Sequence, residues 1–151
     1  MAKKASAADA EVILKLYDLR REPELRKARN WWLITFWPLT ADDYLKISNA
    51  LGTQENAWLR QVNGYWDMAA ALVLHGAVNV DLFVEGGVSG EMFFFFAKVQ
   101  PILKELRAKM QSPGFMRNVE TVVMATKAGR ERLKMVSGRV NARLKAIAEG
   151  K

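Results

Sequence analysis

Acidic side chains beside aromatic rings are the residues of this sequence that could perform acid–base chemistry. Asp67 directly follows Tyr65 and Trp66, and Asp81 and Glu85 stand four residues apart. Carboxylates near an aromatic pocket can transfer protons to and from a bound small molecule. Sequence spacing alone does not bring these positions together, so two interpretations are open. In the first, the carboxylates are solvated side chains on a loop and on a helix surface. In the second, the protein is a small-molecule enzyme that uses the Tyr65-Trp66-Asp67 region.

The residues that bind metals and phosphates are sparse. His75 is the only histidine, and the chain has no cysteine, whereas a zinc site needs several nitrogen or sulfur ligands. We therefore expect no metal and no cofactor, and a structural role for His75 at the end of a helix. Residues 85–91, EGGVSGE, place three glycines before a predicted helix but lack the Lys-Ser/Thr of a phosphate-binding loop, so we predict a flexible connector there.

Positive charge is concentrated in the C-terminal third of the chain. The whole sequence has a net charge of +7, and residues 103–151 hold twelve Lys or Arg against four Asp or Glu. At about 100° per residue, Arg132, Arg139 and Arg143 follow one margin of an apolar stripe in the last predicted helix. The stripe consists of Leu133, Val136, Val140, Leu144 and Ile147, and its other margin holds Arg130, Lys134 and Lys145.

Two interpretations of this basic amphipathic helix remain open. The stripe can pack on the rest of the protein while long basic side chains extend along its margins. Alternatively, Arg132, Arg139 and Arg143 form a binding face for an acidic protein, an anionic membrane surface or nucleic acid. No sequence motif of a nucleic-acid-binding fold supports the last partner.

Aromatic residues gather in two stretches. Residues 26–37, RKARNWWLITFW, could form an interfacial membrane anchor or a platform for nucleic acid bases, but tryptophans at helical spacing favour a core position. In residues 90–98, GEMFFFFAK, Phe93 and Phe94 project away from the apolar stripe that continues through Val99. We predict that this turn is enclosed on all sides, partly by the chain and partly by a second subunit, so Phe93 and Phe94 are candidate subunit contacts of a homo-oligomer.

The elements that position these residues are predicted to be helices. Apolar residues recur at helical spacing, and no run alternates with the period of a strand. Asp9 is the predicted cap of a first helix that ends before Pro23, and a second helix runs from Pro23 to Pro38. Thr40 caps a short third helix that ends near Gly52. The fourth helix carries the clearest apolar face, through Trp58, Val62, Tyr65, Trp66, Ala69, Leu72 and Val73.

The second half continues this pattern. Residues 77–90 are predicted to be a loop with one short turn around 81–84, and Ser89 to cap the phenylalanine helix. Pro101 kinks or restarts that helix, and Ser112-Pro113-Gly114 ends it. Two further helices are predicted, one over residues 115–126 and a final one that Gly129 precedes and that ends at about residue 149. The fold class is therefore all-α, a single-domain bundle of about six to seven helices, with a flexible tail at residues 1–8 and the domain at 9–151.

Residues 65–83, YWDMAAALVLHGAVNVDLF, and 99–107, VQPILKELR, are the basis of a resemblance. Over roughly residues 65–107 the chain resembles an uncharacterised bacterial all-helical family, a domain of unknown function. The resemblance implies a helical fold and transfers no activity.

The sequence as a whole favours a binding protein over an enzyme. No apolar run approaches the roughly 20 residues of a membrane-spanning helix, and the N-terminus lacks the apolar segment of a secretory signal, so we expect a cytoplasmic protein. The leading hypothesis is a non-catalytic helical protein-interaction module. The alternatives are electrostatic binding through the basic C-terminal helix and the enzyme described above.

Overall fold

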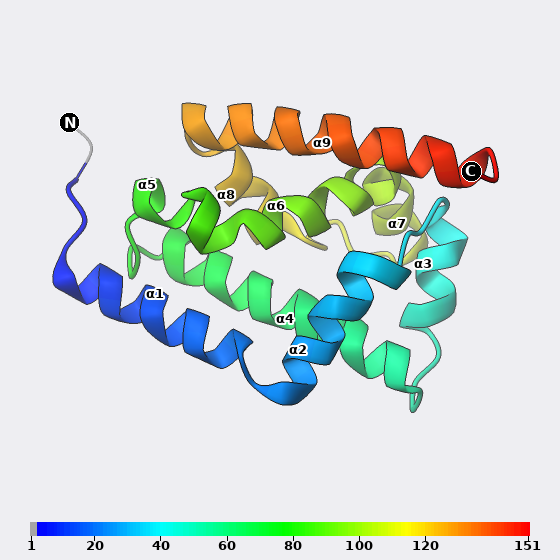
Figure 1. The fold of residues 1–151 in the computed structure, drawn as a ribbon, viewed down its shortest axis with the longest axis horizontal. Coiled ribbons are helices and arrows are strands. Elements are labelled where there is room, and N and C mark those ends of the chain that lie inside the picture. Colours follow the sequence, from blue (N-terminus) through cyan, green and yellow to red (C-terminus); the bar gives the residue numbers. More distant parts are fainter. Residues whose placement is uncertain (1–2) are drawn as a thin grey trace.

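The computed structural model describes residues 3–151, which form helices with no strand among them (Figure 1). The predicted all-α class is confirmed. The elements are α1 (Ala7–Arg20), α2 (Pro23–Asn30), η1 (Trp31–Thr35), α3 (Ala41–Ser48), α4 (Gln54–Leu74), α5 (Val80–Phe83), α6 (Gly86–Val99), η2 (Gln100–Ile102), α7 (Leu103–Lys109), α8 (Arg117–Met124) and α9 (Lys127–Ala148).

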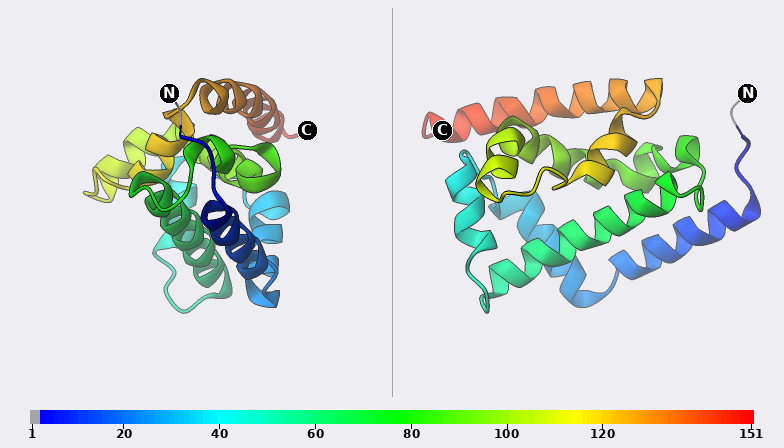
Figure 2. Two further views of the ribbon diagram at one scale, coloured as in Figure 1. Left: turned by 90° about the vertical axis from the view of Figure 1, so that its left-hand side faces the viewer. Right: turned by 180° about the vertical axis from the view of Figure 1, so that it is seen from behind.

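The helices pack as a compact bundle in which α6 is central. Helix α9 runs along one outer side, α6 and α8 lie beneath it, and α1, α2 and α4 form the opposite side (Figures 1 and 2). The closest pairings are α6 with α9, α2 with α4, and α4 with α8. One continuous hydrophobic core extends from Leu16 in α1 to Val140 in α9. None of the helices in residues 3–151 is both long and apolar enough to cross a bilayer.

Helices α1 and α3 each begin with a capping box. In α1 the hydroxyl of Ser6 accepts from the backbone N–H of Asp9, and the Asp9 carboxylate accepts from the Ser6 backbone. Thr40 and Asp43 repeat this arrangement at α3, as predicted for Thr40. The prediction that Asp9 is the cap of α1 is wrong, because Ser6 caps that helix and Asp9 is its third residue. The predicted tail, residues 1–8, falls partly outside the described residues, and its boundary stays a prediction.

The second helix changes its winding before it ends. Pro23 occupies the first turn of α2, as predicted, but after Asn30 the chain forms the π-helical turn η1 and becomes extended at Phe36. The predicted end at Pro38 is therefore too late. Helix α4 matches its prediction and continues through Asn63 and Gly64 without a break.

Helix α6 begins earlier than predicted. It starts at Gly86, and Ser89 forms a kink inside it, with φ −128° and ψ 18°. The Ser89 hydroxyl is buried and donates to the carbonyl oxygen of Phe83 at 2.6 Å, so it ties α6 to α5 instead of capping a helix. The predictions of a loop over residues 77–90 and of a flexible connector at residues 85–91 are therefore wrong in large part. The short turn predicted near residues 81–84 corresponds to α5.

The C-terminal elements follow the predicted breaks. Pro101 lies in the 3-10 turn η2, which joins α6 to α7. Thr126 caps α9 by accepting from the backbone N–H of Gly129, so Gly129 lies inside the first turn of α9 and does not precede it. A Cβ atom at Gly129 would lie 2.7 Å from the carbonyl oxygen of Val123. Only glycine allows this approach of α8 to α9.

Candidate functional site

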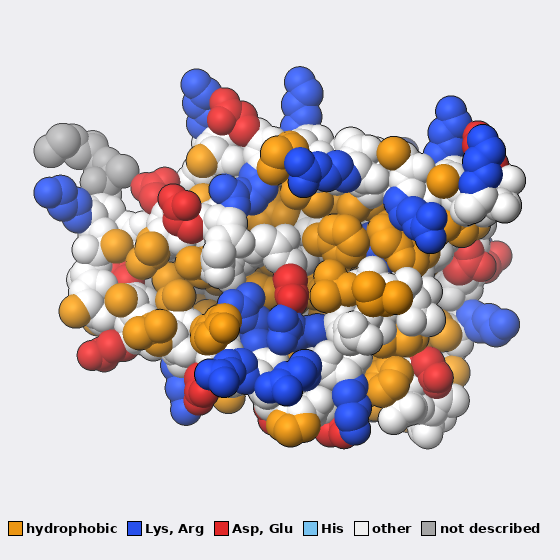
Figure 3. Space-filling view, in the orientation of Figure 1, with side chains coloured by type: hydrophobic (Ala, Val, Ile, Leu, Met, Phe, Trp, Pro, Cys, Tyr) orange, Lys and Arg blue, Asp and Glu red, His pale blue; other side chains and the backbone are white. Residues whose placement is uncertain are grey.

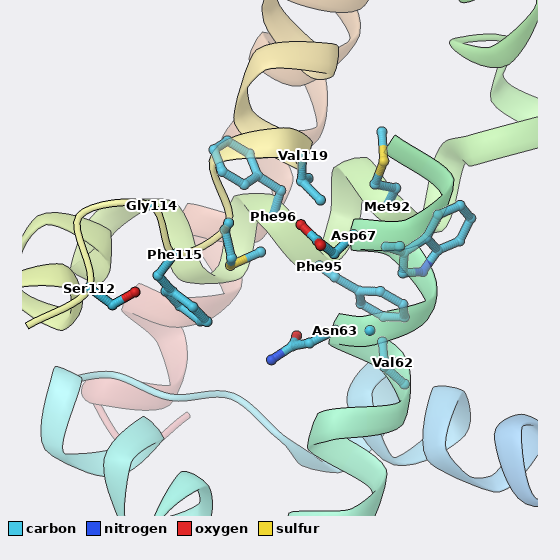
Figure 4. A pocket seen from close by; sticks show the side chains of 13 residues that line it. Val62, Asn63, Asp67, Met92, Phe95, Phe96, Ser112, Gly114, Phe115 and Val119 are labelled. Carbon is cyan, nitrogen blue, oxygen red and sulfur yellow. The ribbon is translucent and has the colours of Figure 1, made fainter. Parts of the chain in front are cut away.

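A cavity of about 330 Å³ lies between α4, α6 and the loop that precedes α8 (Figure 4). Its volume is at the lower end of the range for small-molecule sites. Three segments line it: Val62, Asn63, Gly64, Trp66 and Asp67 from α4; Met92, Phe95 and Phe96 from α6; and Ser112, Gly114, Phe115, Met116 and Val119 from the loop and α8.

The walls of the cavity are aromatic and sulfur-bearing. Phe95 and Phe96 are almost completely buried, and so is Met92 one turn earlier on α6. Phe115 closes another side and packs edge-on against Tyr44, with ring centroids 5.8 Å apart. Burial raises the pKa of the Tyr44 phenol far above its usual value, so this ring stays neutral. Such walls suit the apolar body of a ligand, and methionine can adapt to its shape.

Two polar side chains extend from α4 toward the loop at residues 112–116. Asn63 and Asp67 are four residues apart and therefore lie on the same side of α4, one turn apart (Figure 4). The Asn63 amide nitrogen donates to the hydroxyl of Tyr44. Asp67 Oδ1 accepts from the amide nitrogen of Asn118 at 3.1 Å. These hydrogen bonds hold both side chains at the cavity.

Two glycines line the cavity without a packing reason in the described structure. A Cβ atom built on Gly64 or on Gly114 would meet nothing within 4 Å, and neither residue has a positive φ. A glycine in a helix interior, as Gly64 is in α4, costs about 0.5–1 kcal/mol relative to alanine. Both residues are exposed, so a larger side chain at either position would stand at the opening of the cavity.

The predicted Tyr65-Trp66-Asp67 region divides between two sides of α4. Trp66 and Asp67 line the cavity, whereas the Tyr65 hydroxyl donates to the carbonyl oxygen of Leu16 in α1 at 2.6 Å. Burial raises the pKa of Tyr65 to about 12. Trp66 is 4% exposed, and its indole nitrogen has no hydrogen-bond partner among residues 3–151. Tyr65 therefore supports the packing of α1 and takes no part in the cavity.

The other predicted acidic residues lie elsewhere. Asp81 is exposed on α5, and Glu85 is exposed at the start of α6. Neither lines the cavity, so the structure does not pair them with Asp67. His75 is the exposed C-cap residue of α4. Within residues 3–151, no three His, Asp or Glu side chains cluster in a way that could hold a metal ion.

The three predicted anion-binding arginines are not equivalent. Arg132 is half-buried, and its guanidinium lies 5.8 Å from the centre of the Phe93 ring. Its Nη1 occupies the space that a side chain at Gly86 would need. Arg139 and Arg143 are exposed and form no ion pair within residues 3–151. The structure therefore gives Arg132 a packing role and leaves Arg139 and Arg143 available to a partner.

The four phenylalanines are covered mainly from within the chain. Phe93 is 0% exposed, so the prediction that it contacts a second subunit is wrong: α9, with Arg132, covers it. Phe94 is half-buried and packs edge-on against Trp37, with centroids 5.7 Å apart. Its remaining surface keeps the subunit contact open as a prediction for this ring alone.

The tryptophan-rich stretch, residues 26–37, belongs largely to the core, as predicted. Trp31, Trp32 and Phe36 are buried, and their rings pack against one another. Trp37 is half-buried at the edge of this cluster. An aromatic platform for bases would need exposed rings, and in this stretch the buried rings leave little surface for one.

Lys98 is a buried charged residue that was not predicted from the sequence, and it is 0% exposed. Its ammonium donates to the carbonyl oxygens of Trp32 and Phe36, the latter at 2.8 Å, and lies 3.7 Å from the centre of the Trp37 ring. Burial lowers the pKa of Lys98 to about 7. Its position in an apolar run, four residues after Phe94 and four before Ile102, was a signal that this lysine faces the core.

The fold and the site thus define a class of protein, an all-helical domain with an aromatic cavity. The chain belongs to a family described as a domain of unknown function, DUF4760, which matches residues 5–126. The predicted resemblance to an uncharacterised domain family is confirmed, and the match extends well beyond residues 65–107. The matched residues include the whole lining of the cavity and stop at Thr126, the cap of α9. Comparisons with curated proteins and with solved structures found no match.

Proposed function

We propose that this domain binds a small, largely apolar molecule in the cavity between α4 and α6. The observation that carries the proposal is a cavity of about 330 Å³ whose walls are aromatic rings and methionine side chains. Ligand sites are typically concave and apolar, with a few polar groups that orient the ligand. Asn63 and Asp67 are such groups, because their own hydrogen bonds fix them at the cavity.

Binding fits the lining better than catalysis. Asp67 is the single charged residue among the cavity-lining residues, all of which lie in the described part of the chain. Acid–base catalysis of the kind considered from the sequence needs a second group that can exchange a proton near the first. The lining provides no histidine, lysine or second carboxylate for this role.

A titration followed by ¹H–¹⁵N NMR tests the proposal. With 3-phenylpropan-1-ol as the probe, we expect shifts at the backbone amides of Asn63 and Gly64 and at the indole N–H of Trp66. Gly64→Leu should weaken binding because its side chain takes up space at the wall. Gly138→Leu is the matched control, since Gly138 is also exposed within a long helix and has open space at its Cβ. Shifts remote from the cavity, or equal binding by Gly64→Leu, would refute the proposal.

A second candidate function rests on the outer face of α9. This helix holds seven Lys or Arg and one Glu, and Lys and Arg side chains are spaced along the side of the molecule that α9 forms (Figure 3). We propose that Arg139 and Arg143 contact an anionic partner, because both are exposed and without an ion pair in the described residues. An acidic protein, an anionic membrane or nucleic acid would each satisfy this face electrostatically.

The experiment for this second candidate leaves Arg132 unchanged. The double variant Arg139→Gln and Arg143→Gln should weaken binding to duplex DNA or to anionic vesicles at low salt, and binding by the parent should fall as salt rises. A double variant of Lys15→Gln and Arg21→Gln, both exposed on or beside α1, removes the same charge elsewhere. If the two double variants lose equal affinity, net charge and not the α9 face is responsible.

A further inference from the structure

We infer that the ligand of the cavity is a ring-bearing small molecule with a protonated amine, held by Asp67 and Asn63. This inference rests on the proposed function. It follows from the kinds of hydrogen-bonding groups that the cavity offers, from the charge at its rim and from its volume.

The charged group at the rim is an acceptor. Asn63 adds a group of either kind, because its carbonyl oxygen and the second N–H of its amide make no hydrogen bond among the described residues. Asp67 accepts from Asn118 through Oδ1, which leaves Oδ2 without a partner in the same part of the chain. An ionised carboxylate can only accept hydrogen bonds. A ligand group that satisfies Asp67 must therefore donate, and the Asn63 carbonyl oxygen can accept from the same group.

The charge at the rim favours a cationic donor. The nearest arginines along the chain are engaged elsewhere: Arg60, one turn before Gly64, donates to Asn56, and Arg117 donates to the Pro113 carbonyl oxygen and lies 4.0 Å from Glu120. Neither lines the cavity. Asp67 thus places a negative charge at the opening of a site in a protein whose net charge is +7. A protonated amine matches this charge and supplies three donors.

The interior favours a ring. Phe95, Phe96 and Phe115 provide flat apolar walls, and aromatic rings pack well edge-on or offset against them. A cavity of about 330 Å³ holds one ring with a short chain. A longer ligand would extend past Asp67 into solvent.

Three probes of equal length separate the contributions of ring and charge. The full chain is titrated with 3-phenylpropylamine, 3-phenylpropan-1-ol and 3-phenylpropanoate under the NMR conditions above. The amine should bind about fivefold more tightly than the alcohol, as expected for a partly exposed ion pair, and the carboxylate should bind most weakly. Asp67→Asn should bring the ratio of the amine affinity to the alcohol affinity close to one. Asp18→Asn, an exposed aspartate on α1, is the control and should leave this ratio unchanged.

Salt provides a test that needs no variant. If Asp67 selects the amine by charge, the advantage of the amine over the alcohol should shrink as salt rises to about 0.5 M. Equal affinities for amine and alcohol, a preference for the carboxylate, or an advantage that salt and Asp67→Asn leave intact would each overturn this inference while the proposed function stands. Failure of all three probes to bind would overturn the proposed function itself.

Discussion

The Lys98 side chain links two segments that are distant in the sequence. A buried ammonium is costly unless it is hydrogen-bonded. In this protein the carbonyl oxygens of Trp32 and Phe36, in and just after η1, accept its protons, and the Trp37 ring faces the charge. The π-helical turn leaves these carbonyls available, and Lys98 is the side chain that pairs with them. Lys98 therefore stabilises the winding of a segment that lies more than sixty residues earlier in the chain.

Stability should therefore depend on pH through Lys98. Its pKa of about 7 in the folded protein lies below the value of 10.5 for an ordinary lysine. Between these values the unfolded chain binds more protons than the folded one, so the free energy of unfolding should rise from pH 7 toward pH 9.5. Above about pH 10 the raised pKa values of Tyr44 and Tyr65 act in the opposite direction, because the folded state then keeps protons that the unfolded state loses.

Urea denaturation at pH 6, 7.5 and 9 measures this dependence, and Lys98→Met is the informative variant. It should flatten the rise with pH because methionine does not titrate. It also leaves the two carbonyl oxygens unpaired, at a cost of about 1–3 kcal/mol each. A variant that keeps the same rise with pH would mean that another group is responsible.

Trp66 gives a second prediction at this scale. Since the residue is 4% exposed, Trp66→Ala should lower the free energy of unfolding by about 3–5 kcal/mol. Trp66→Phe should cost much less, because the indole nitrogen makes no hydrogen bond in the described structure and its loss leaves no group unpaired. Thermal unfolding of both variants checks the order. An unchanged midpoint for Trp66→Ala would mean that the ring is not part of the core.

At the scale of the helix, two glycines should respond oppositely to the same substitution. Gly64→Ala in α4 meets open space and should raise the free energy of unfolding by about 0.5–1 kcal/mol. Gly129→Ala in α9 brings a Cβ atom to 2.7 Å from the Val123 carbonyl oxygen and should destabilise the protein. Chemical denaturation of the two variants compares them directly. A loss of stability with Gly64→Ala would show that packing does require this glycine.

The helices that sequence patterns predict well are those whose signals are local. The apolar face of α4 and the cap at Thr40 depend on residues within a few turns, and both are found as predicted. The start of α6 and the turn η1 depend on distant partners: Ser89 bonds to Phe83, and Lys98 reaches back to Trp32. Of the candidate site, Trp66 and Asp67 were predicted from the sequence. The opposite wall was not, since Gly114 and Phe115 reach it through tertiary packing of an irregular loop.

At the scale of the molecule, the apolar side of α9 covers the bundle, and its outer side carries charged side chains. Leu133 and Val140 face inward and are almost fully buried, while Arg139 and Arg143 face solvent. This arrangement satisfies the first interpretation of the basic helix, in which an apolar stripe packs and basic side chains flank it. The exposed side chains of Arg139 and Arg143 remain available for the second interpretation, in which the helix binds an anionic partner. The family match ends where this cover begins.

Removal of α9 tests its contribution to the domain. A chain that ends at Thr126 would expose Phe93 and the surface of α6 that α9 covers. Loss of the burial of Leu133 and Val140 alone should lower the free energy of unfolding by about 3 kcal/mol or more. Thermal unfolding and size-exclusion chromatography measure stability and aggregation. The double variant Arg139→Gln and Arg143→Gln should keep the parent midpoint, and an unchanged midpoint in the shortened chain would contradict the role of α9 as a cover.

Long-range hydrogen bonds to α5 and α6 also determine when the nascent chain can complete its packing. In α6, Glu91 pairs with Arg29 and Lys98 with Trp32, across 62 and 66 residues. Asn79, the cap of α5, pairs with Asp9 across 70 residues. At about 5–20 residues per second, a ribosome adds that length of chain in roughly 3–14 s. During this interval the tryptophans of η1 have left the ribosome's catalytic centre without the helix that later covers them. The nascent N-terminal half therefore lacks the contacts of Trp32 with Phe95 and Lys98 until α6 has been synthesised.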